Sequence, residues 1–241
     1  MPKIKFITNR PWLSEKDPSA PEPVSKSLPD WYKNADRYAK MSNGQHLIGP
    51  DKGKIPTWKA CPALYDIFVT GYTYKTPCDI EFYLNDNDEI SVRVSNQKYH
   101  DFVHLRPPMQ QFEHPKGYYK KHFAWWPDWA VAVPDGYSVL YSQPFGRYDL
   151  PFLTTSGIVD NDKVNLPGTF PFFIQEGWTG VLPAGTAYAQ MIPFKREDWE
   201  SEYEISTSET IMKKNFENVK KYRVPNGGVY LNEVWERRKY E

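Results

Sequence analysis

Four histidines fall close together in the sequence, and imidazole is the side chain that most often binds transition metals. They are His100, His104, His114 and His122. If neighbouring strands brought them together, their nitrogens could bind iron or zinc, and Asp101 would add a carboxylate. Their spacing matches neither H-x-H nor H-x-D followed by a distant histidine. We therefore expect no metal, and a metal or sugar site at His100, His104 and His114 stays open as an alternative.

Three tryptophans lie in the segment FAWWPDWAV at residues 123–131. They are Trp125, Trp126 and Trp129, and such rings can stack on a sugar or a base, or anchor a partner protein. No lysine or arginine lies between them, which disfavours a nucleic-acid role. The cluster therefore indicates either a corner of the protein core or a protein interface.

Five prolines and no sustained period mark residues 9–34, which predicts an extended arm. Trp12, Trp31 and Tyr32 place large apolar rings on this arm. Because exposed rings of this size are costly, we expect residues 9–40 to dock on something. The arm would either wrap its own β domain or contact a neighbouring subunit.

Short strands recur from Trp58 onward and are separated by proline, glycine or aspartate. CDIEFYLN and EISVRVSN alternate polar and apolar residues, and DNDE between them reads as a hairpin turn. Such a pattern predicts a mostly β protein with a closed or double-sheet domain, β-clip or jelly-roll-like. The predicted division is an N-terminal strand and proline-rich arm (1–57), a β domain (58–196) and a C-terminal helical extension (197–241).

Apolar residues near helical spacing in SETIMKKNFENVKKY predict a C-terminal helix over residues 207–222. Ser206 and Glu209 have the S-x-x-E spacing of a capping box.

Charge and cysteine content exclude several classes of protein. Lysine plus arginine and aspartate plus glutamate number 30 each, so the basic excess of a nucleic-acid coat is missing. Cys61 and Cys78 have no metal-ligand spacing, and we expect two reduced thiols. No signal-peptide core and no run of about eighteen apolar residues is present, so we expect a soluble protein made in a reducing cytoplasm.

The segment GIVDND (157–162), followed by AGTAYAQMIPF (184–194), resembles the dUTPase and dCTP-deaminase superfamily. Members of that superfamily carry G-[VI]-[IV]-D-x-D and then G-x-x-x-A-Q before a hydrophobic strand. PDGYSVLYSQP before these segments is similar to a further strand of the family, and the resemblance covers roughly residues 130–195. The matching residues are Gly157, Ile158, Val159, Asp160, Asp162, Gly185, Ala189, Gln190, Met191 and Ile192.

This resemblance implies a nucleotide site in which Asp160 orients the attacking water, with Asp162, Arg147, Gln190 and Mg²⁺ completing it. The chain departs from the family pattern in three places. Lys163 replaces the tyrosine that supports the sugar, QPFGRYD lacks the Arg-Ser pair that binds phosphate, and the C-terminus offers only NGG in place of a glycine-rich motif. The resemblance therefore predicts a related scaffold more strongly than a retained reaction.

The whole layout, from SLPDWYKN to IPFKREDW, also resembles uncharacterised proteins of marine tailed phages, cyanophages among them. That resemblance supplies a setting and no activity, and we expect synthesis in the host cytoplasm. The zero net charge, the high aromatic content and the incomplete catalytic motifs favour a structural component of the virion. We predict a phage-encoded structural or protein-interaction protein without catalytic activity or cofactor. Its partners would be protein subunits, its own copies or other virion proteins, in an oligomer and without a membrane. The alternatives are a dUTPase-like nucleotide hydrolase or binder and a cupin-like metal or sugar-binding protein.

Overall fold

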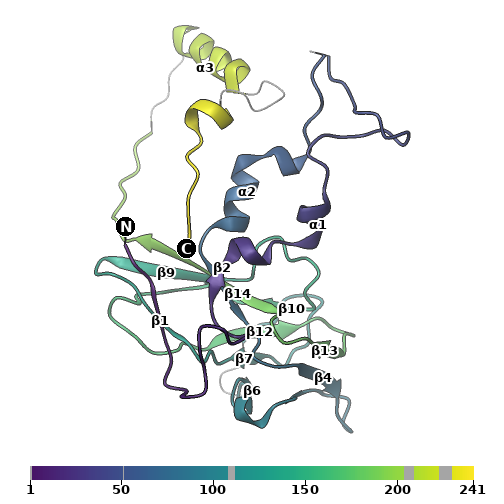
Figure 1. The fold of residues 1–241 in the computed structure, drawn as a ribbon, viewed down its shortest axis with the longest axis vertical. Helices are drawn as coiled ribbons and strands as arrows, with labels where there is room; N and C mark the ends of the chain where they lie inside the picture. The colour runs from purple at the N-terminus through teal and green to yellow at the C-terminus, as the bar shows by residue number, and fades with distance from the viewer. Residues whose placement is uncertain (1, 51, 108–111, 204–208, 223–229) are drawn as a thin grey trace. The chain divides into compact units, whose positions relative to one another are not determined.

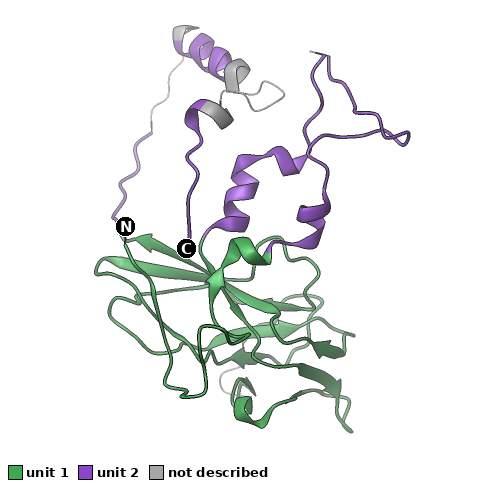
Figure 2. Ribbon diagram, viewed as in Figure 1, with its two compact units in different colours: residues 1–27, 71–196 green, residues 28–70, 197–241 purple. Residues whose placement is uncertain are grey.

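The computed structural model describes residues 2–50, 52–107, 112–203, 209–222 and 230–241. The chain forms two compact units, each built from segments that are distant in sequence (Figure 1, Figure 2). Unit 1 consists of residues 1–27 and 71–196, and unit 2 consists of residues 28–70 and 197–241. The first 27 residues are thus part of the β unit.

Within the described residues, the strands of unit 1 form four antiparallel sheets, which confirms the prediction of a mostly β, double-sheet protein (Figure 1). The five-stranded sheet has the order β11 (Gly157–Val159), β9 (Tyr137–Ser142), β14 (Ala187–Lys195), β3 (Tyr72–Lys75), β2 (Glu22–Pro23). The four-stranded sheet has the order β10 (Phe152–Thr154), β12 (Phe170–Ile174), β7 (Phe123–Trp125), β6 (Val103–Leu105). The three-stranded sheet has the order β13 (Gly180–Leu182), β4 (Ile80–Leu84), β5 (Ile90–Val94). The two-stranded sheet pairs β1 (Lys5–Ile7) with β8 (Ala130–Ala132).

Aromatic side chains of the two largest sheets meet in the core of unit 1. Trp125 in β7 stacks on Phe172 in β12, with ring centres 3.6 Å apart, and lies 4.9 Å from Tyr188 in β14. Tyr141 in β9 and Phe170 in β12 make a similar contact at 4.7 Å. Full burial of such a ring contributes about 1.5–3 kcal/mol, so these contacts hold the two sheets face to face.

The N-terminal residues pack on their own β unit. β1 pairs with β8, and β2 pairs with β3. The indole nitrogen of Trp129 donates to the hydroxyl of Ser19 at 3.3 Å, and a short 3-10 helix (Val24–Ser27) follows β2. This part of the predicted arm therefore docks within the chain itself.

One glycine is required where β3 begins. Gly71 has φ +86°, a conformation that side chains disfavour, and a Cβ there would lie 2.0 Å from the carbonyl oxygen of Met191 in β14. The absence of a side chain therefore lets the chain enter β3 directly beside β14.

Unit 2 contains the longer helices and confirms the predicted C-terminal helix. Its helical elements are α1 (Asp30–Asn34), a 3-10 helix (Trp58–Ala60), α2 (Pro62–Val69), α3 (Glu209–Tyr222) and a π-helical turn (Tyr230–Val234). The capping residue predicted for α3, Ser206, lies outside the described residues. The indole nitrogen of Trp235 donates to Asp66 in α2 at 2.9 Å, which ties the last described segment to that helix. Among the described residues, no helix has the length and apolar character needed to span a membrane.

Candidate functional site

Arg196 binds the second of the two candidate aspartates in an arrangement that we call the arginine clamp. Arg196 directly follows β14 and Asp162 comes soon after β11, the two strands that flank β9. Nη1 of Arg196 donates to Oδ1 of Asp162 at 2.9 Å, Nη2 donates to Oδ2, and the backbone N–H of Gly136 donates to Oδ2 at 2.9 Å. The Arg196 guanidinium holds the pKa of Asp162 well below its usual range.

Asp160 has different surroundings. Its carboxylate accepts a hydrogen bond from the hydroxyl of Ser138 at 2.6 Å, and Nη1 of Arg196 lies 3.2 Å away. The Ser138 hydrogen bond and then the Arg196 charge lower the pKa of Asp160. Because 44% of its side chain is exposed, Asp160 is an ionised carboxylate open to solvent, which is what orienting a water molecule requires.

The other two residues of the predicted nucleotide site have partners elsewhere. Arg147 donates through two nitrogens to Asp149, at 2.8 and 2.7 Å, and this lowers the pKa of Asp149. Gln190 is buried, and its side-chain oxygen accepts the backbone N–H of Phe145 at 3.2 Å. Gln190 pairs with Ser142 at the end of β9, four residues from Ser138 and so about 13 Å along the strand. The four residues therefore do not converge on one point.

A second candidate site, the tryptophan groove, is a hollow of about 590 Å³ in unit 1. Its apolar walls include two half-exposed indoles and a leucine, and its charged residues come from the N-terminal segment and two loops. These residues are Trp12, Trp126, Leu166, Arg10, Asp101 and Asp128.

Arg10 joins the two carboxylates of this groove. It donates through Nη2 to Oδ2 of Asp101 at 2.6 Å and through Nε to Oδ1 of Asp128 at 2.9 Å. The side chain of Asp128 is only 2% exposed, and burial raises its pKa against the opposing effect of Arg10. The second oxygen of each carboxylate is buried, and no hydrogen-bond donor to it is present among the described residues.

The six aromatic residues proposed as partner contacts divide by exposure. Trp12 is 42% exposed and Trp126 is 45% exposed. Trp125, Trp129 and Tyr32 are core residues in this structure, and Trp31 packs edge-on against Tyr32. Trp12 and Trp126, the two exposed tryptophans of this set, both line the tryptophan groove although they are far apart in the sequence.

The histidines have separate surroundings. His104 packs on the ring of Trp126 at 5.6 Å, His122 packs on Phe173 in the interior, and His100 contacts the backbone carbonyl of Gln97. Over the described ranges, no group of three or more histidine, cysteine, aspartate or glutamate side chains is placed to hold a metal ion.

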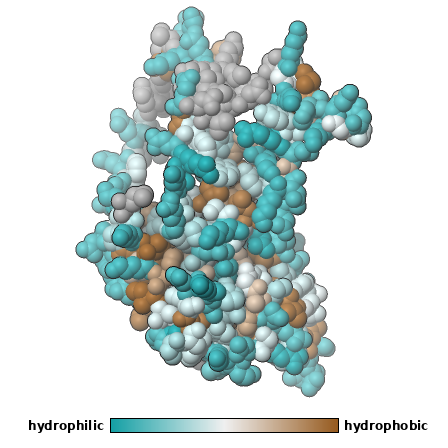
Figure 3. All heavy atoms as spheres, viewed as in Figure 1, coloured by the Kyte–Doolittle hydropathy of each residue, from teal (hydrophilic) through white to brown (hydrophobic). Residues whose placement is uncertain are grey.

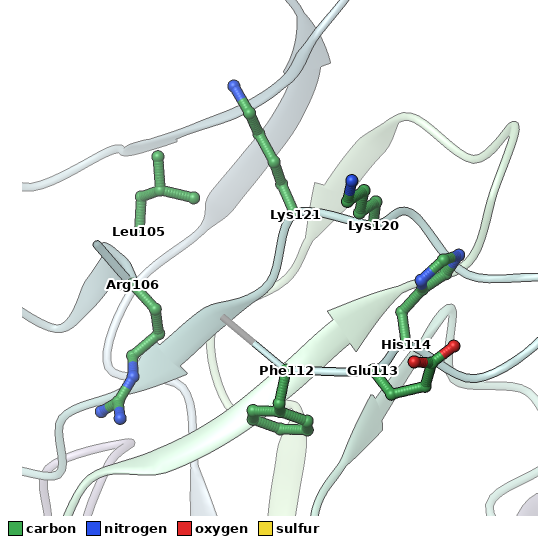
Figure 4. Close-up of a pocket in the computed structure, with 7 residues that line it drawn as sticks. All are labelled: Leu105, Arg106, Phe112, Glu113, His114, Lys120 and Lys121. Atoms are coloured by element: carbon green, nitrogen blue, oxygen red, sulfur yellow. The ribbon is translucent and has the colours of Figure 1, made fainter. Parts of the chain in front are cut away.

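His114 lines a hollow of about 880 Å³ in unit 1, together with basic and apolar side chains (Figure 4). Lys121 forms an ion pair with Glu89. Figure 4 shows Lys121 and Arg106 pointing in opposite directions, so these two cations do not converge.

Comparisons with known proteins give a partial likeness to solved structures. The sequence matches no protein-family model and no curated protein sequence. Among solved structures, a mutant dUTPase from phage phi11 of S. aureus matches with a TM-score of 0.25 and 12% identity, over 44% of this chain and 97% of that chain. This structural resemblance to a phage dUTPase is weak. The resemblance to marine tailed-phage proteins stays a prediction.

Proposed function

We propose that this chain is a non-catalytic protein-interaction protein, encoded by a phage and made in the host cytoplasm. Its partners are protein subunits, either its own copies or other proteins of the virion. The arginine clamp supports the non-catalytic part of this proposal. Bound triphosphate needs cationic side chains or backbone donors aimed at it, but Arg196 is paired with Asp162 and Arg147 is paired with Asp149.

A nucleotide assay tests this proposal. Purified full-length chain incubated with dUTP or dCTP and Mg²⁺ should release no product above the rate of the Asp160→Asn variant. The ionised, half-exposed carboxylate of Asp160 favours the alternative, a Mg²⁺-dependent hydrolase or nucleotide binder that also uses Asp162, Arg147 and Gln190. Turnover that disappears in Asp160→Asn would establish that alternative and refute our proposal.

Exposed aromatic side chains support the interaction part of the proposal. Trp199 and Tyr203, in the extended segment that opens the C-terminal part of unit 2, are 88% and 89% exposed. Figure 3 shows apolar residues as separate patches on a largely hydrophilic face. Burying each ring against a subunit would contribute about 1.5–3 kcal/mol, so we propose both residues as subunit contacts.

Light scattering tests this contact. The full-length chain should have a mass above that of a monomer, and Trp199→Ala with Tyr203→Ala should lower it. Tyr148→Ala removes a ring of unit 1 that is 79% exposed and serves as the matched control. A monomeric wild-type chain would contradict self-assembly, and mass spectrometry of purified virions would then test assembly with other proteins.

A further inference from the structure

We propose that the tryptophan groove binds a neutral saccharide, a short oligosaccharide whose sugar rings lie against Trp126 and Trp12. This inference goes beyond the subunit contacts, because Trp199 and Tyr203 belong to unit 2 and every residue of the groove belongs to unit 1.

The apolar walls of the groove suit the C–H face of a sugar ring. Trp126 and Trp12 keep nearly half of their surfaces exposed, and Leu166 adds a third apolar side chain. Sites for small ligands combine such apolar walls with a few fixed polar groups, within volumes of roughly 300–1,000 Å³. At about 590 Å³ the groove has room for more than one sugar ring.

The charges at the groove favour a neutral ligand. Asp101 and Asp128 carry negative charge, while Arg10 and Lys98, which lie 5.6 and 5.9 Å from the ring centre of Trp12, carry positive charge. These four charges cancel. An anionic nucleotide or a strongly cationic segment would therefore gain little here. His104 beside Trp126 does not alter the balance, because burial lowers its pKa.

The polar groups match hydroxyl chemistry. A sugar hydroxyl both donates and accepts hydrogen bonds, so it can pair with a carboxylate and a guanidinium at once. Asp101 and Asp128 each have one oxygen bound by Arg10 and a second, buried oxygen without a donor among the residues that the structure describes. The side chains of Arg10 and Asp101 are 24% and 39% exposed, so a ligand hydroxyl in the groove can reach this ion pair.

The groove is also organised in advance. Two carboxylates bind the Arg10 guanidinium, one at Nε and one at Nη2. This guanidinium and the Lys98 ammonium lie over the Trp12 ring. A ring that is already fixed loses little conformational entropy when a ligand stacks on it. The N-terminal segment thereby supplies Arg10 and Trp12 to the site.

A glycan array probed with labelled full-length chain tests the proposal. Oligosaccharides retained on the array, with maltotriose and chitotriose as soluble probes, are then titrated while tryptophan fluorescence is measured. At least one neutral saccharide should bind and shift the emission. Trp126→Ala should weaken that binding at least about tenfold, as expected for loss of one stacking ring, and Trp126→Tyr should restore part of it.

The controls separate this proposal from the subunit contacts. Trp199→Ala should leave saccharide binding unchanged, and Trp126→Ala should leave the mass in light scattering unchanged. Circular dichroism checks that each variant is folded. The proposal is overturned if no glycan binds, or if binding survives Trp126→Ala and Trp12→Ala. It is also overturned if a proline-rich peptide carrying arginine quenches Trp126 while no saccharide does, which would assign the groove to a protein partner.

Discussion

Asp160 and Asp162 are separated by one residue, yet one carboxylate is open to solvent and the other is covered by Arg196. The resemblance of GIVDND to the superfamily motif singled out both aspartates. The sequence did not predict the contact of Arg196 with Asp162, because Asp162 lies 34 residues earlier in the chain. Only the strand order β11, β9, β14 brings the two together, and that order has no local signal beyond a basic residue after the last strand.

The arginine clamp should make the stability of unit 1 depend on pH in the acid range. The pKa values of Asp160 and Asp162 are lowered in the folded state. Their contribution to stability is therefore complete above the unfolded value of about 4 and is lost as the pH falls through the lower folded values. Urea unfolding followed at about pH 7 and about pH 2.5 should show a larger loss for wild type than for Asp162→Asn.

Asp86→Asn changes an exposed carboxylate in the turn between β4 and β5 and is the matched control. It should behave as the wild type does. An equal acid response of Asp162→Asn and wild type would show that the arginine clamp adds nothing to stability.

At the scale of elements, local patterns predicted much of what is observed. CDIEFYLN and EISVRVSN became β4 and β5, and the turn residues between them set their pairing. The pairing of β1 with β8 and of β2 with β3 had no such signal, because strands two and three residues long carry too little alternation to specify a partner. The sequence did not decide whether the tryptophan cluster belongs to the core or to an interface. In the structure Trp125 is buried in the core and Trp126 is half exposed.

Gly71, the residue before β3, should tolerate no side chain. Gly71→Ala should lower the free energy of unfolding by at least about 2 kcal/mol, because the added Cβ meets the carbonyl of Met191 and φ is positive. Gly177→Ala is the control, since that glycine has φ +79° but open space around it, and it should cost about 1 kcal/mol. Chemical denaturation measures both, and equal losses would mean that the backbone yields freely at Gly71.

The N-terminal segment should stabilise unit 1 through Arg10. Arg10→Ala leaves the buried carboxylate of Asp128 without its cation, so it should cost about 2 kcal/mol, less than for a fully buried pair because Arg10 is partly exposed. Arg93→Ala removes a pair of similar geometry, with Glu81, that is largely exposed, and it should cost less than about 1 kcal/mol. Thermal unfolding of both variants distinguishes them, and the reverse ranking would refute this role for Arg10.

At the scale of the whole molecule, composition gives the clearest prediction. The net formal charge is +0, and the proposed subunit contacts are aromatic, so association should depend little on ionic strength. The mass in light scattering should stay the same between about 0.05 and about 0.5 M salt. A sharp fall in mass with salt would point to charged contacts in place of Trp199 and Tyr203.

Arg196 is also the last residue of unit 1 before the chain continues into unit 2. Its backbone N–H donates to the carbonyl of Gly136 at 2.8 Å, and its guanidinium binds Asp162 in the turn after β11. β14 just before it is hydrogen-bonded on both edges, to β3 and to β9. A pull on residues 197–241 would therefore act first on Arg196, with its backbone hydrogen bond and its ion pairs to Asp160 and Asp162, and then on the hydrogen bonds of β14. These contacts therefore anchor the β unit at the point where the chain leaves it.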